Sequence, residues 1–458
     1  MNQDLNIVIL AAGQGKRMNS TKPKVLHAIS TKPMLEHVIE TALSLSPHKL
    51  IVVYGHGGEQ VQAAMEARFG NELITWAHQS QQLGTGHALK SALAELSASG
   101  RTLVLYGDVP LITRATLEKM LAAYADNIVM LSDVVANPFG YGRVIRNTNQ
   151  QICGIVEEKD TDSQQKLITE INTGFYILPN ARIGGWLNAL SNNNSQGEYY
   201  LTDVVELAYN AGVAIEAVFA ASHYEVMGVN NSLQLEELER IYQLNKVEEL
   251  MRQGITVTDK KRLDLRGTLT VGKDCVIDIN CIFEDKVVLG NNVTIGAGCL
   301  LKNVTIADNV TIKPYSLLED AEVGVGAQIG PYSRLRPGAK LAEDVHVGNF
   351  VEIKKSSVGK GSKVNHLTYI GDAEIGSKVN VGAGSVTCNY DGVNKFTTTI
   401  KDNVFVGSGT MMVAPVVINE GSVIGAGSVI TKDTQANQLT VARAYQVTVN
   451  GWERPTKK

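Results

Sequence analysis

Three absences narrow what this 458-residue chain can be. Cysteine is scarce, with five residues, and none of them has the spacing of a metal site. No apolar run is long enough for a membrane span or a secretory leader, since residues 6–10 lead directly into glycines. The net charge of -4 gives no strong positive field for nucleic acid. These absences predict a cytoplasmic protein with no membrane insertion and no nucleic-acid partner, in which local cations and backbone amides hold any anionic substrate.

The first half of the chain alternates apolar, β-branched runs with amphipathic stretches. This alternation is typical of an α/β domain with a largely parallel, Rossmann-like sheet, which we expect over residues 1–229. The predicted strands are residues 7–10, 50–54, 73–76, 103–106 and 128–131, and the predicted helices include 34–45 and 86–97.

A glycine-free stretch with apolar residues at helical spacing follows this domain. It begins after Asn230 and Asn231, which are suited to cap a helix, and it stops at Gly254. The pattern predicts one linker helix over residues 230–253.

Beyond the linker, a bulky apolar residue recurs at nearly every sixth position from Val271 to Ile430. A period of six suits a short strand and a tight corner, so three hexads form a triangular coil of about 18 residues. The pattern predicts a parallel β-helix of hexapeptide repeats over residues 254–458, with a C-terminal tail. The long break in the pattern, residues 385–405, predicts a loop that projects from the coil. The interior positions would take the small side chains of Cys275, Cys281 and Cys299.

The glycines that follow the first predicted strand suggest a phosphate-binding turn. Gly13 and Gly15 would let backbone N–H groups approach a phosphate, and Arg17 and Lys24 would neutralise its charge. The dinucleotide and P-loop fingerprints both fail, because a third glycine and a closing Gly-Lys-Ser/Thr are missing. A tight βα turn with solvated basic residues also explains this segment.

Asp108 lies at the end of another predicted strand, in the segment Tyr106-Gly107-Asp108-Val109-Pro110. A carboxylate at the carboxyl end of a strand is suited to hold Mg²⁺ against triphosphate oxygens. A simple turn residue before Val-Pro is the alternative.

Further motifs lead to a more specific hypothesis. They are Gln82-Leu83-Gly84-Thr85-Gly86, Gly140-Tyr141-Gly142-Arg143, Glu157-Glu158-Lys159, Ile171-Asn172-Thr173-Gly174 and Gly228-Val229-Asn230. In this order and spacing, the first half resembles the nucleotidyltransferase domain of the bifunctional N-acetylglucosamine-1-phosphate uridyltransferase/glucosamine-1-phosphate acetyltransferase family. The resemblance continues through the hexads to the C-terminus. It implies an enzyme of UDP-N-acetylglucosamine synthesis that transfers UMP from UTP to N-acetylglucosamine 1-phosphate and releases pyrophosphate.

The resemblance also implies residue roles in the first domain. Asp108 and Asn230 would hold Mg²⁺, while Arg17 and Lys24 would be catalytic cations. Lys16 departs from the family, whose members commonly have Thr there. The implied contacts to uracil and ribose are Gln79, Gly84 and Thr85, those to the sugar are Tyr106, Gly142, Glu157 and Asn172, and the remaining substrate contacts are Leu10, Ala11, Ala12, Gly13 and Gly107.

Coil geometry points to a second site. Arg336 and Lys354 each follow an apolar rung and lie one 18-residue coil apart, so we expect them to stack on one edge about 5 Å apart. Two like charges at that distance are unfavourable unless an anion lies between them, which predicts a phosphate site. Glu352, Tyr369 and His366 would converge on the same edge. A polar surface edge with ion pairs explains the same residues.

The segments 336–338, 349–355, 365–372 and 380–384 look like the acetyltransferase centre of the same family. The resemblance implies that His366 is the general base, since imidazole can accept a proton from a glucosamine ammonium near neutral pH, and that Glu352 assists it. It also implies a left-handed β-helix and a homotrimer. The implied ligands of glucosamine 1-phosphate are Arg336, Lys354, Tyr369 and Asn380, and those of acetyl-CoA are Ala383, Asn389, Tyr390, Ser408, Ala426 and Arg443.

Two other functions stay open. In one, the β-helix of a nucleotidyltransferase serves only assembly or allostery, and in the other the chain is a non-catalytic regulatory subunit. The group around His366 argues against the first, while Arg17, Lys24 and Asp108 argue against the second.

Overall fold

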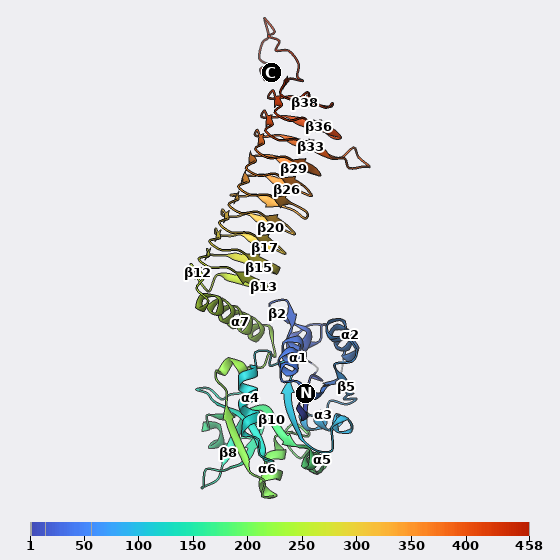
Figure 1. Ribbon diagram of the computed structural model, residues 1–458. Helices are drawn as coiled ribbons and strands as arrows, with labels where there is room; N and C mark the ends of the chain where they lie inside the picture. Colours follow the sequence, from blue (N-terminus) through green and yellow to red (C-terminus); the bar gives the residue numbers. More distant parts are fainter. Residues whose placement is uncertain (1, 14, 56, 458) are drawn as a thin grey trace. The chain divides into compact units, whose positions relative to one another are not determined.

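The computed structural model describes residues 2–13, 15–55 and 57–457, and it divides the chain into two compact units, Met1–Tyr242 and Gln243–Lys458 (Figure 1). Gln14, in the glycine turn, lies outside the described residues. Within the part of the chain that the structure describes, no helix has both the length and the apolar composition needed to cross a bilayer.

In its described residues, the first unit is built on a nine-stranded sheet with the main order β11-β7-β10-β6-β1-β4-β5. Strands β5, β4, β1 and β6 pair in parallel, as do β7 and β11, whereas β10 is antiparallel to both of its neighbours. Strands β8 and β9 form an antiparallel arm beside β10. The bounds are β1 Asn2–Leu10, β4 Pro47–Tyr54, β5 Thr75–His78, β6 Arg101–Tyr106, β7 Ile128–Val134, β8 Gly142–Arg146, β9 Ile152–Val156, β10 Glu170–Pro179 and β11 Ile215–Phe219.

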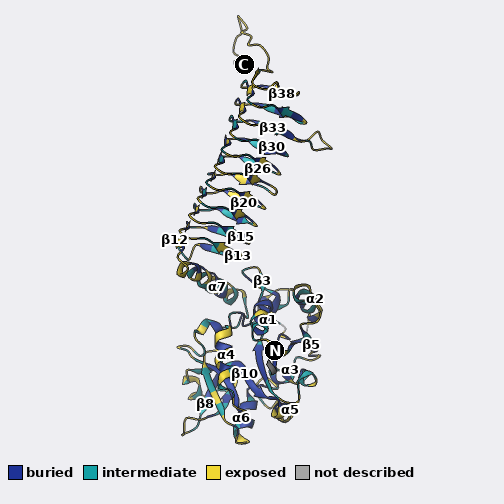
Figure 2. Cartoon of the chain, viewed as in Figure 1, coloured by how far each residue is buried: buried dark blue, intermediate teal, exposed yellow. Residues whose placement is uncertain are grey.

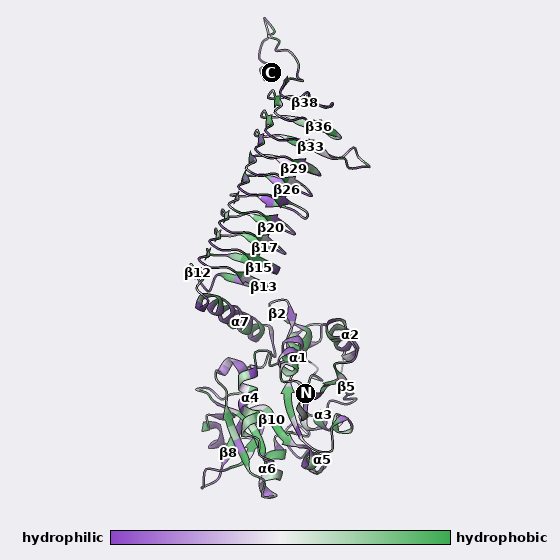
Figure 3. Ribbon diagram, viewed as in Figure 1, coloured by the Kyte–Doolittle hydropathy of each residue, from purple (hydrophilic) through white to green (hydrophobic). Residues whose placement is uncertain are grey.

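Helices pack on both faces of this sheet because its strands are apolar on both sides. In β1, Leu5, Ile7 and Ile9 point into one core. Val8 and Leu10 point into the other, as the alternation of side chains along a strand requires. Figure 2 shows the central strands as buried, and Figure 3 shows them as hydrophobic. The predicted α/β domain is therefore confirmed. Helices α1 Met34–Ser44, α2 Gly58–Phe69 and α4 Arg114–Ala123 pack in the first core, and α3 Thr85–Ser91, α5 Asn180–Ala189 and α6 Asp203–Asn210 in the second.

Two local predictions are wrong in their bounds. The strand predicted at 73–76 lies at Thr75–His78, because Leu73 is 53% exposed in the loop before it and the chain pairs with β4 only after that loop. The helix predicted at 86–97 lies at Thr85–Ser91, because the chain then tightens into a 3-10 turn that leads back toward β6.

A long helix, α7, runs from Ser232 to Arg252 and lies within residues 230–253, where the sequence pattern predicts one. The side-chain oxygen of Asn231 accepts a hydrogen bond of 3.0 Å from the first turn, which caps the helix. Leu238 packs in the first unit, and Val247 belongs to the core of the second. Short elements of the first unit are η1 Lys16–Met18, η2 Lys24–Leu26, β2 Ala28–Ile29, β3 Lys32–Pro33, η3 Leu93–Glu95, η4 Glu158–Asp160, η5 Gln165–Leu167 and η6 His223–Val226.

The described residues of the second unit form a parallel β-helix with three faces, which confirms the predicted hexapeptide-repeat fold. The long strands β13 and β15 bend around one corner and join the second face to the third. The first face holds β12 Thr256–Val257, β14 Val276–Ile277, β16 Thr294–Ile295, β19 Thr311–Ile312, β22 Gln328–Ile329, β25 His346–Asn349, β28 Lys363–His366, β31 Asn380–Val381, β34 Phe405–Val406, β37 Val423–Ile424 and β39 Leu439–Thr440. The other two hold β13 Leu263–Val271, β15 Cys281–Leu289, β17 Leu300–Lys302, β18 Thr305–Ile306, β20 Leu317–Glu319, β21 Glu322–Val323, β23 Arg334–Leu335, β24 Lys340–Leu341, β26 Glu352–Lys354, β27 Ser357–Val358, β29 Tyr369–Gly371, β30 Ala373–Ile375, β32 Val386–Cys388, β33 Thr398–Ile400, β35 Met411–Val413, β36 Val416–Ile418 and β38 Val429–Ile430.

The coils stack in tight register. Ile329 pairs with Val347 and Val347 with Val364, so one coil takes 18 residues and the next takes 17. These rungs are buried. A Cβ atom on Gly348 would lie 1.9 Å from the carbonyl oxygen of Asn365, which explains why a glycine follows the rung. The apolar period therefore marks the side chains that fill the interior of the coil. The glycines mark the positions where neighbouring coils approach closely.

The three cysteines at interior positions are packing residues, as predicted. Cys275, Cys281 and Cys299 are buried. Burial raises the pKa of Cys281 to about 12 and that of Cys299 to about 11, so both thiols stay protonated at neutral pH.

One coil is longer than the rest, because Asn380 pairs with Phe405, 25 residues further on. The loop predicted at 385–405 is wrong in extent, since β32 and β33 continue the ladder inside it and only residues 389–397 leave the coil, near β33 in Figure 1. The sequence pattern missed these strands because Thr387 takes the place of an aliphatic rung. Its buried hydroxyl bonds with the backbone of the preceding coil.

Candidate active sites

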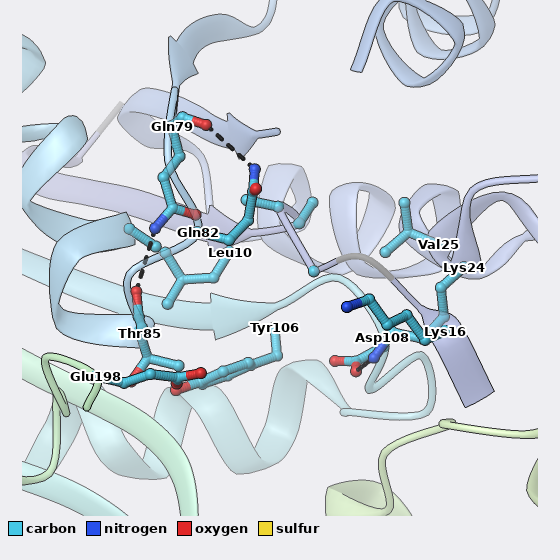
Figure 4. Close-up of a pocket in the computed structure, with 15 residues that line it drawn as sticks. Leu10, Lys16, Lys24, Val25, Gln79, Gln82, Thr85, Tyr106, Asp108 and Glu198 are labelled. Carbon is cyan, nitrogen blue, oxygen red and sulfur yellow. Dashed lines mark hydrogen bonds and ion pairs between the residues drawn. The ribbon is translucent and has the colours of Figure 1, made fainter. Parts of the chain in front are cut away.

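The first unit contains a pocket of about 540 Å³ beside the carboxyl ends of β1 and β6 (Figure 4). In Figure 4, Gln79 and Gln82 lie at one end of the pocket, and Lys24 and Asp108 lie at the other. The pocket thus has one end with two glutamine amides and another end with a Lys–Asp ion pair. The predicted residues that line it are Leu10, Ala11, Ala12, Gly13, Lys24, Gln79, Gly84, Thr85, Tyr106 and Asp108.

The glycine turn after β1 brings basic residues to the end with the Lys–Asp ion pair. Gly15 has a positive φ of 62°, and a Cβ atom there would lie 2.7 Å from Cβ of Lys24, so the glycine lets η2 pack against the turn. Lys16 lines the pocket, while the exposed Arg17 is not among the lining residues. The backbone N–H of Gly107 donates to the carbonyl oxygen of Leu10 at 3.0 Å. This hydrogen bond joins the carboxyl end of β6 to that of β1.

Asp108 and Asn230 meet although they are far apart in sequence. The backbone N–H of Val229 donates to the carbonyl oxygen of Asp108 at 2.9 Å, which holds the following residue, Asn230, beside it. The ammonium of Lys24 pairs with Asp108 Oδ2 and lies 3.3 Å from Asn230 Oδ1. A cation is therefore already shared by the two oxygens, and oxygen donors of this kind suit Mg²⁺.

The described residues contain no group of three or more His, Cys, Asp or Glu side chains able to hold a metal. A metal at Asp108 and Asn230 would therefore need further oxygen ligands from substrate phosphates and water, which is the usual arrangement for Mg²⁺.

The predicted sugar contacts lie around the carboxyl end of β6. Asn172 pairs with Gly142 in the ladder between β10 and β8, and a Cβ atom on Gly142 would lie 3.5 Å from Glu157 Oε2. Glu157 accepts a 3.1 Å hydrogen bond from the hydroxyl of Thr202, and its burial raises the pKa of its carboxyl group. Burial, followed by the nearby Glu157 and Asp108 carboxylates, raises the pKa of Tyr106. Its phenol therefore stays a hydrogen-bond donor.

On the β-helix, the predicted basic edge forms with one difference. Leu335 pairs with Ile353, so Arg336 and Lys354 follow paired rungs as expected. The Arg336 guanidinium is, however, partly neutralised by Glu352, at 2.8 Å.

Lys354 has a second cationic neighbour that the sequence pattern did not reveal. Lys395, from the loop that leaves the coil, lowers the pKa of Lys354 through a side-chain contact and through its charge, and Arg336 adds to this effect. The Asp372 carboxylate partly offsets this effect, and the remaining positive charge lies mainly on Lys354 and Lys395. An anion placed between them would relieve their repulsion.

His366 lies one coil from Asn349, and its Nδ1 atom is 3.2 Å from Asn349 Oδ1. An amide oxygen can only accept a hydrogen bond, so this contact places the ring proton on Nδ1 and leaves the lone pair on Nε2. The ring is exposed, and Tyr369 follows it across the corner at the start of β29. In the neutral ring, this geometry therefore leaves the lone pair on Nε2 at the surface of the coil.

A column of small residues continues from His366 along the same edge. Gly384 N donates to His366 O, Gly409 N to Ala383 O, and Gly427 N to Ser408 O, so these positions are equivalent on successive coils. Ala426 comes next, and its carbonyl accepts a hydrogen bond from the Arg443 guanidinium. Four of the residues predicted for acetyl-CoA, Ala383, Ser408, Ala426 and Arg443, therefore form a continuous strip beside the imidazole.

The other predicted residues of this unit are more scattered. Asn380 lies on the first face in register with Lys363 of the preceding coil. Asn389 is buried, and its amide donates to the carboxylate of Asp372. Tyr390 is 58% exposed on the loop, and its hydroxyl donates to a carbonyl of the same loop.

Family models match both units. The model of a MobA-like NTP transferase domain matches residues 7–164, a GMPPB C-terminal domain matches residues 265–359, and bacterial transferase hexapeptide (six repeats) matches residues 397–432.

Complete relatives match nearly the whole chain. A "Bifunctional protein GlmU" of Chromobacterium violaceum is 60% identical over 454 residues, which is 99% of each chain. Proteins of the same name from Neisseria meningitidis and Ralstonia nicotianae are 56% and 52% identical, and each alignment covers 99% of this chain and 98% and 99% of theirs.

The chain belongs to the GlmU family.

As a GlmU-family protein matched over its full length, the chain is a bifunctional transferase, with uridyltransferase and acetyltransferase activities in UDP-N-acetylglucosamine synthesis. This membership argues against the two alternatives left open by the sequence, a β-helix without an activity of its own and a regulatory subunit.

Several residues at the two sites of this GlmU-family chain were not predicted from sequence. Lys395 comes from a loop, and the sequence offers no periodic signal that would bring it to Lys354. Glu198 lies in an irregular segment between α5 and α6, far from the other pocket residues in sequence. The unpredicted residues that line the pocket are Lys16, Val25, Gln82, Ala88 and Glu198.

Proposed function

We propose that the two activities reside in separate sites, with acetyl transfer on the β-helix and uridyl transfer in the pocket of the first unit. The domains would be the nucleotidyltransferase domain, residues 1–229, the linker helix, 230–253, and the acetyltransferase domain, 254–458. Acetylation of glucosamine 1-phosphate comes first and gives the N-acetylglucosamine 1-phosphate that the uridyltransferase uses.

In the acetyl transfer, His366 is the general base. The amine nitrogen of glucosamine 1-phosphate attacks the thioester carbonyl of acetyl-CoA, its proton passes to His366 Nε2, the C–S bond breaks, and CoA leaves as the thiol after protonation. The hydrogen bond from Nδ1 to Asn349 supports this role, because it keeps the lone pair on Nε2. Glu352 lies on the same edge, where it pairs with Arg336, and its proposed role is to assist the base.

The sugar phosphate is bound by the positive edge. Arg336, Lys354, Tyr369 and Asn380 are the proposed ligands, and we add Lys395 because its repulsion with Lys354 would be relieved by a phosphate. Acetyl-CoA lies along the strip of small residues, so that its thioester reaches the imidazole. Its proposed contacts are Ala383, Asn389, Tyr390, Ser408, Ala426 and Arg443.

In the uridyl transfer, a phosphate oxygen of N-acetylglucosamine 1-phosphate attacks the α-phosphorus of UTP in line, the bond to the β-phosphate breaks, and pyrophosphate leaves. Mg²⁺ held by Asp108 and Asn230 would supply charge neutralisation on the triphosphate. Arg17 and Lys24 bind phosphate oxygens, while the backbone from Leu10 to Gly13 and Gly107 frames the nucleotide.

Polar residues in the pocket and around the carboxyl end of β6 orient the substrates. The base and ribose lie against Gln79, Gly84 and Thr85. The N-acetylglucosamine moiety lies against Tyr106, Gly142, Glu157 and Asn172. The phenol of Tyr106, the amide of Asn172 and the carboxylate of Glu157 support binding of a sugar, whose hydroxyls need both donors and acceptors.

We also propose that the β-helix forms a homotrimer and that loop residues complete a neighbour's acetyltransferase site. Exposed aromatic side chains support this. Tyr315, Tyr332 and Phe350 stack along one corner with ring centroids 5.2 Å and 5.5 Å apart, and each is more than half exposed. A stripe of this kind is suited to protein–protein contact.

The observation that carries the proposal is the presence of two differently equipped sites, one with the Lys24–Asp108–Asn230 group and one with His366 beside the strip of small residues. The test uses the full chain with two variants. We expect His366→Ala to abolish CoA release from acetyl-CoA and glucosamine 1-phosphate and to spare pyrophosphate formation, and Asp108→Ala to do the reverse. Loss of both activities in either folded variant would contradict separate sites.

A further inference from the structure

The orientation of the Gln79 amide, at the end of the pocket that holds the two glutamines, is fixed by its neighbours. Gln79 is 3% exposed and follows β5, where its backbone N–H donates to the carbonyl of Tyr54 at 2.8 Å. Its side-chain nitrogen lies 3.2 Å from the carbonyl oxygen of Gly84 and 3.1 Å from Nδ1 of His87. Gly84 and His87 lie before and within the first turn of α3.

These two contacts determine which atoms carry hydrogens. The carbonyl oxygen of Gly84 can only accept, so the atom that faces it must be the amide nitrogen of Gln79. The second hydrogen of the same nitrogen points to His87 Nδ1, which must therefore carry a lone pair and leave the ring proton on Nε2. His87 acts as a hydrogen-bond acceptor for the amide.

The consequence appears on the other side of the amide. With both hydrogens of its nitrogen engaged, Gln79 turns its Oε1 atom away from α3, and among the described residues no donor reaches that oxygen. Gln79 lines the pocket (Figure 4). The pocket therefore receives an acceptor, and a flip of the amide would replace it with a donor.

This distinction matches the difference between two pyrimidines. Uracil carries a hydrogen on N3 and can donate it to Gln79 Oε1, whereas cytosine has a lone pair on N3 that would face the same oxygen. A flipped amide would instead donate to cytosine N3. Sites that pair a buried polar group with one substrate discriminate strongly against an analogue that leaves the group unpaired.

We propose that His87 is a positioning residue that gives the uridyltransferase its preference for UTP over CTP, by holding the Gln79 amide with its oxygen toward the base. This inference rests on the proposed function, in which Gln79 faces the base. His87 itself need not touch the nucleotide.

The test compares kcat and KM for UTP with those for CTP in the full-length enzyme, with Mg²⁺ and N-acetylglucosamine 1-phosphate present. Pyrophosphate release is the quantity measured. His87→Leu removes the acceptor, and we expect the ratio of kcat/KM for UTP to that for CTP to fall about tenfold, mainly through a higher KM for UTP. His87→Asn can present its oxygen near the position of Nδ1, and we expect it to retain the ratio.

Lys90→Ala, at an exposed position of the same helix, is the matched control. CoA release by the β-helix shows whether each variant is folded.

Gln79→Ala separates the inference from the proposed function. If Gln79→Ala leaves the ratio unchanged, Gln79 does not face the base, and both the base contact and the role of His87 are wrong. If Gln79→Ala lowers the ratio but His87→Leu does not, the base contact stands and the role of His87 is wrong. An equal loss in His87→Leu and His87→Asn would also contradict the acceptor role, because it would indicate packing alone.

Discussion

Lys24 and Asp108 form an ion pair in which the ammonium also reaches Asn230, and side-chain exposure is only 12% for Lys24 and 18% for Asp108. The two oxygens proposed to hold Mg²⁺ are thus already satisfied by a cation. Metal binding at these oxygens would have to displace this ammonium, and Lys24 would then be available for substrate phosphates. The ion pair would therefore link the proposed metal site to the proposed phosphate site.

We predict that Lys24→Met tightens binding of a divalent cation in the absence of nucleotide, by about threefold to tenfold, because the competing ammonium is removed. Uridyl transfer should nevertheless fall at least about 100-fold, because the cation that binds the phosphates is lost. Titration with Mn²⁺, followed by electron paramagnetic resonance, measures the first effect, and pyrophosphate release measures the second. Lys22→Met, at a nearby exposed position, is the control. Weaker metal binding in Lys24→Met would contradict the competition.

Asn349 should matter for acetyl transfer through the tautomer of His366. In Asn349→Leu, the acceptor for Nδ1 is lost and the ring proton can move to Nε2, so kcat for CoA release should fall about tenfold. Pyrophosphate release should not change, because it depends on the other unit. An unchanged kcat for CoA release would show that Asn349 does not set the tautomer.

Lys395 should contribute to the binding of glucosamine 1-phosphate. We expect Lys395→Ala to raise KM for this substrate about tenfold with little change in kcat, because a charge near the phosphate is lost while the base remains. The melting temperature without ligand should stay the same or rise, because the repulsion with Lys354 is relieved. Lys401→Ala, an exposed lysine that directly follows β33, serves as the comparison. A change in kcat alone would place Lys395 outside the phosphate site.

Access along the strip of small residues should determine acetyl-CoA binding. A larger side chain in Ala383→Leu would project from the coil next to His366, and we expect KM for acetyl-CoA to rise about tenfold or more. Pyrophosphate release and the KM for UTP should be unaffected. Normal acetyl-CoA kinetics in this variant would show that the cofactor lies elsewhere.

The sequence predicted the features that depend on a repeated local pattern. The six-residue period of apolar residues predicted the β-helix because each of these side chains, such as that of Ile329, must pack in the same interior. The unbroken apolar run at residues 7–10 predicted a strand, and this strand is buried on both faces. The pattern failed where a residue of another type took the buried place, as Thr387 did by bonding its hydroxyl to the backbone.

Contacts that depend on loops could not be predicted in the same way. The approach of Lys395 to Lys354 depends on the path of residues 389–397, which have no period. The contact of His87 with Gln79 depends on how α3 follows the turn at Gly84, and the sequence shows only a histidine in a short helix. The position of Asp108 could be predicted because its motif directly follows a strand. The carboxyl ends of parallel strands meet at one edge of the sheet, so a residue there lies at the site.

The carboxyl group of Asp203 should make the first unit less stable as pH rises. Burial, followed by the nearby Glu206 and Asp160 carboxylates, raises its pKa from 3.8 to about 6. The folded state therefore binds more protons than the unfolded state between these values, so stability falls as pH rises through this window and levels off above about pH 6. Asp203→Asn removes the penalty. Discounted for partial exposure, the effect is about 1 kcal/mol, so the melting temperature of the variant should exceed that of the wild type by about 2–4 °C more at pH 7.5 than at pH 4. Glu72→Gln, at an exposed loop position, should show no such difference, and an equal gain of Asp203→Asn at both pH values would contradict the assignment.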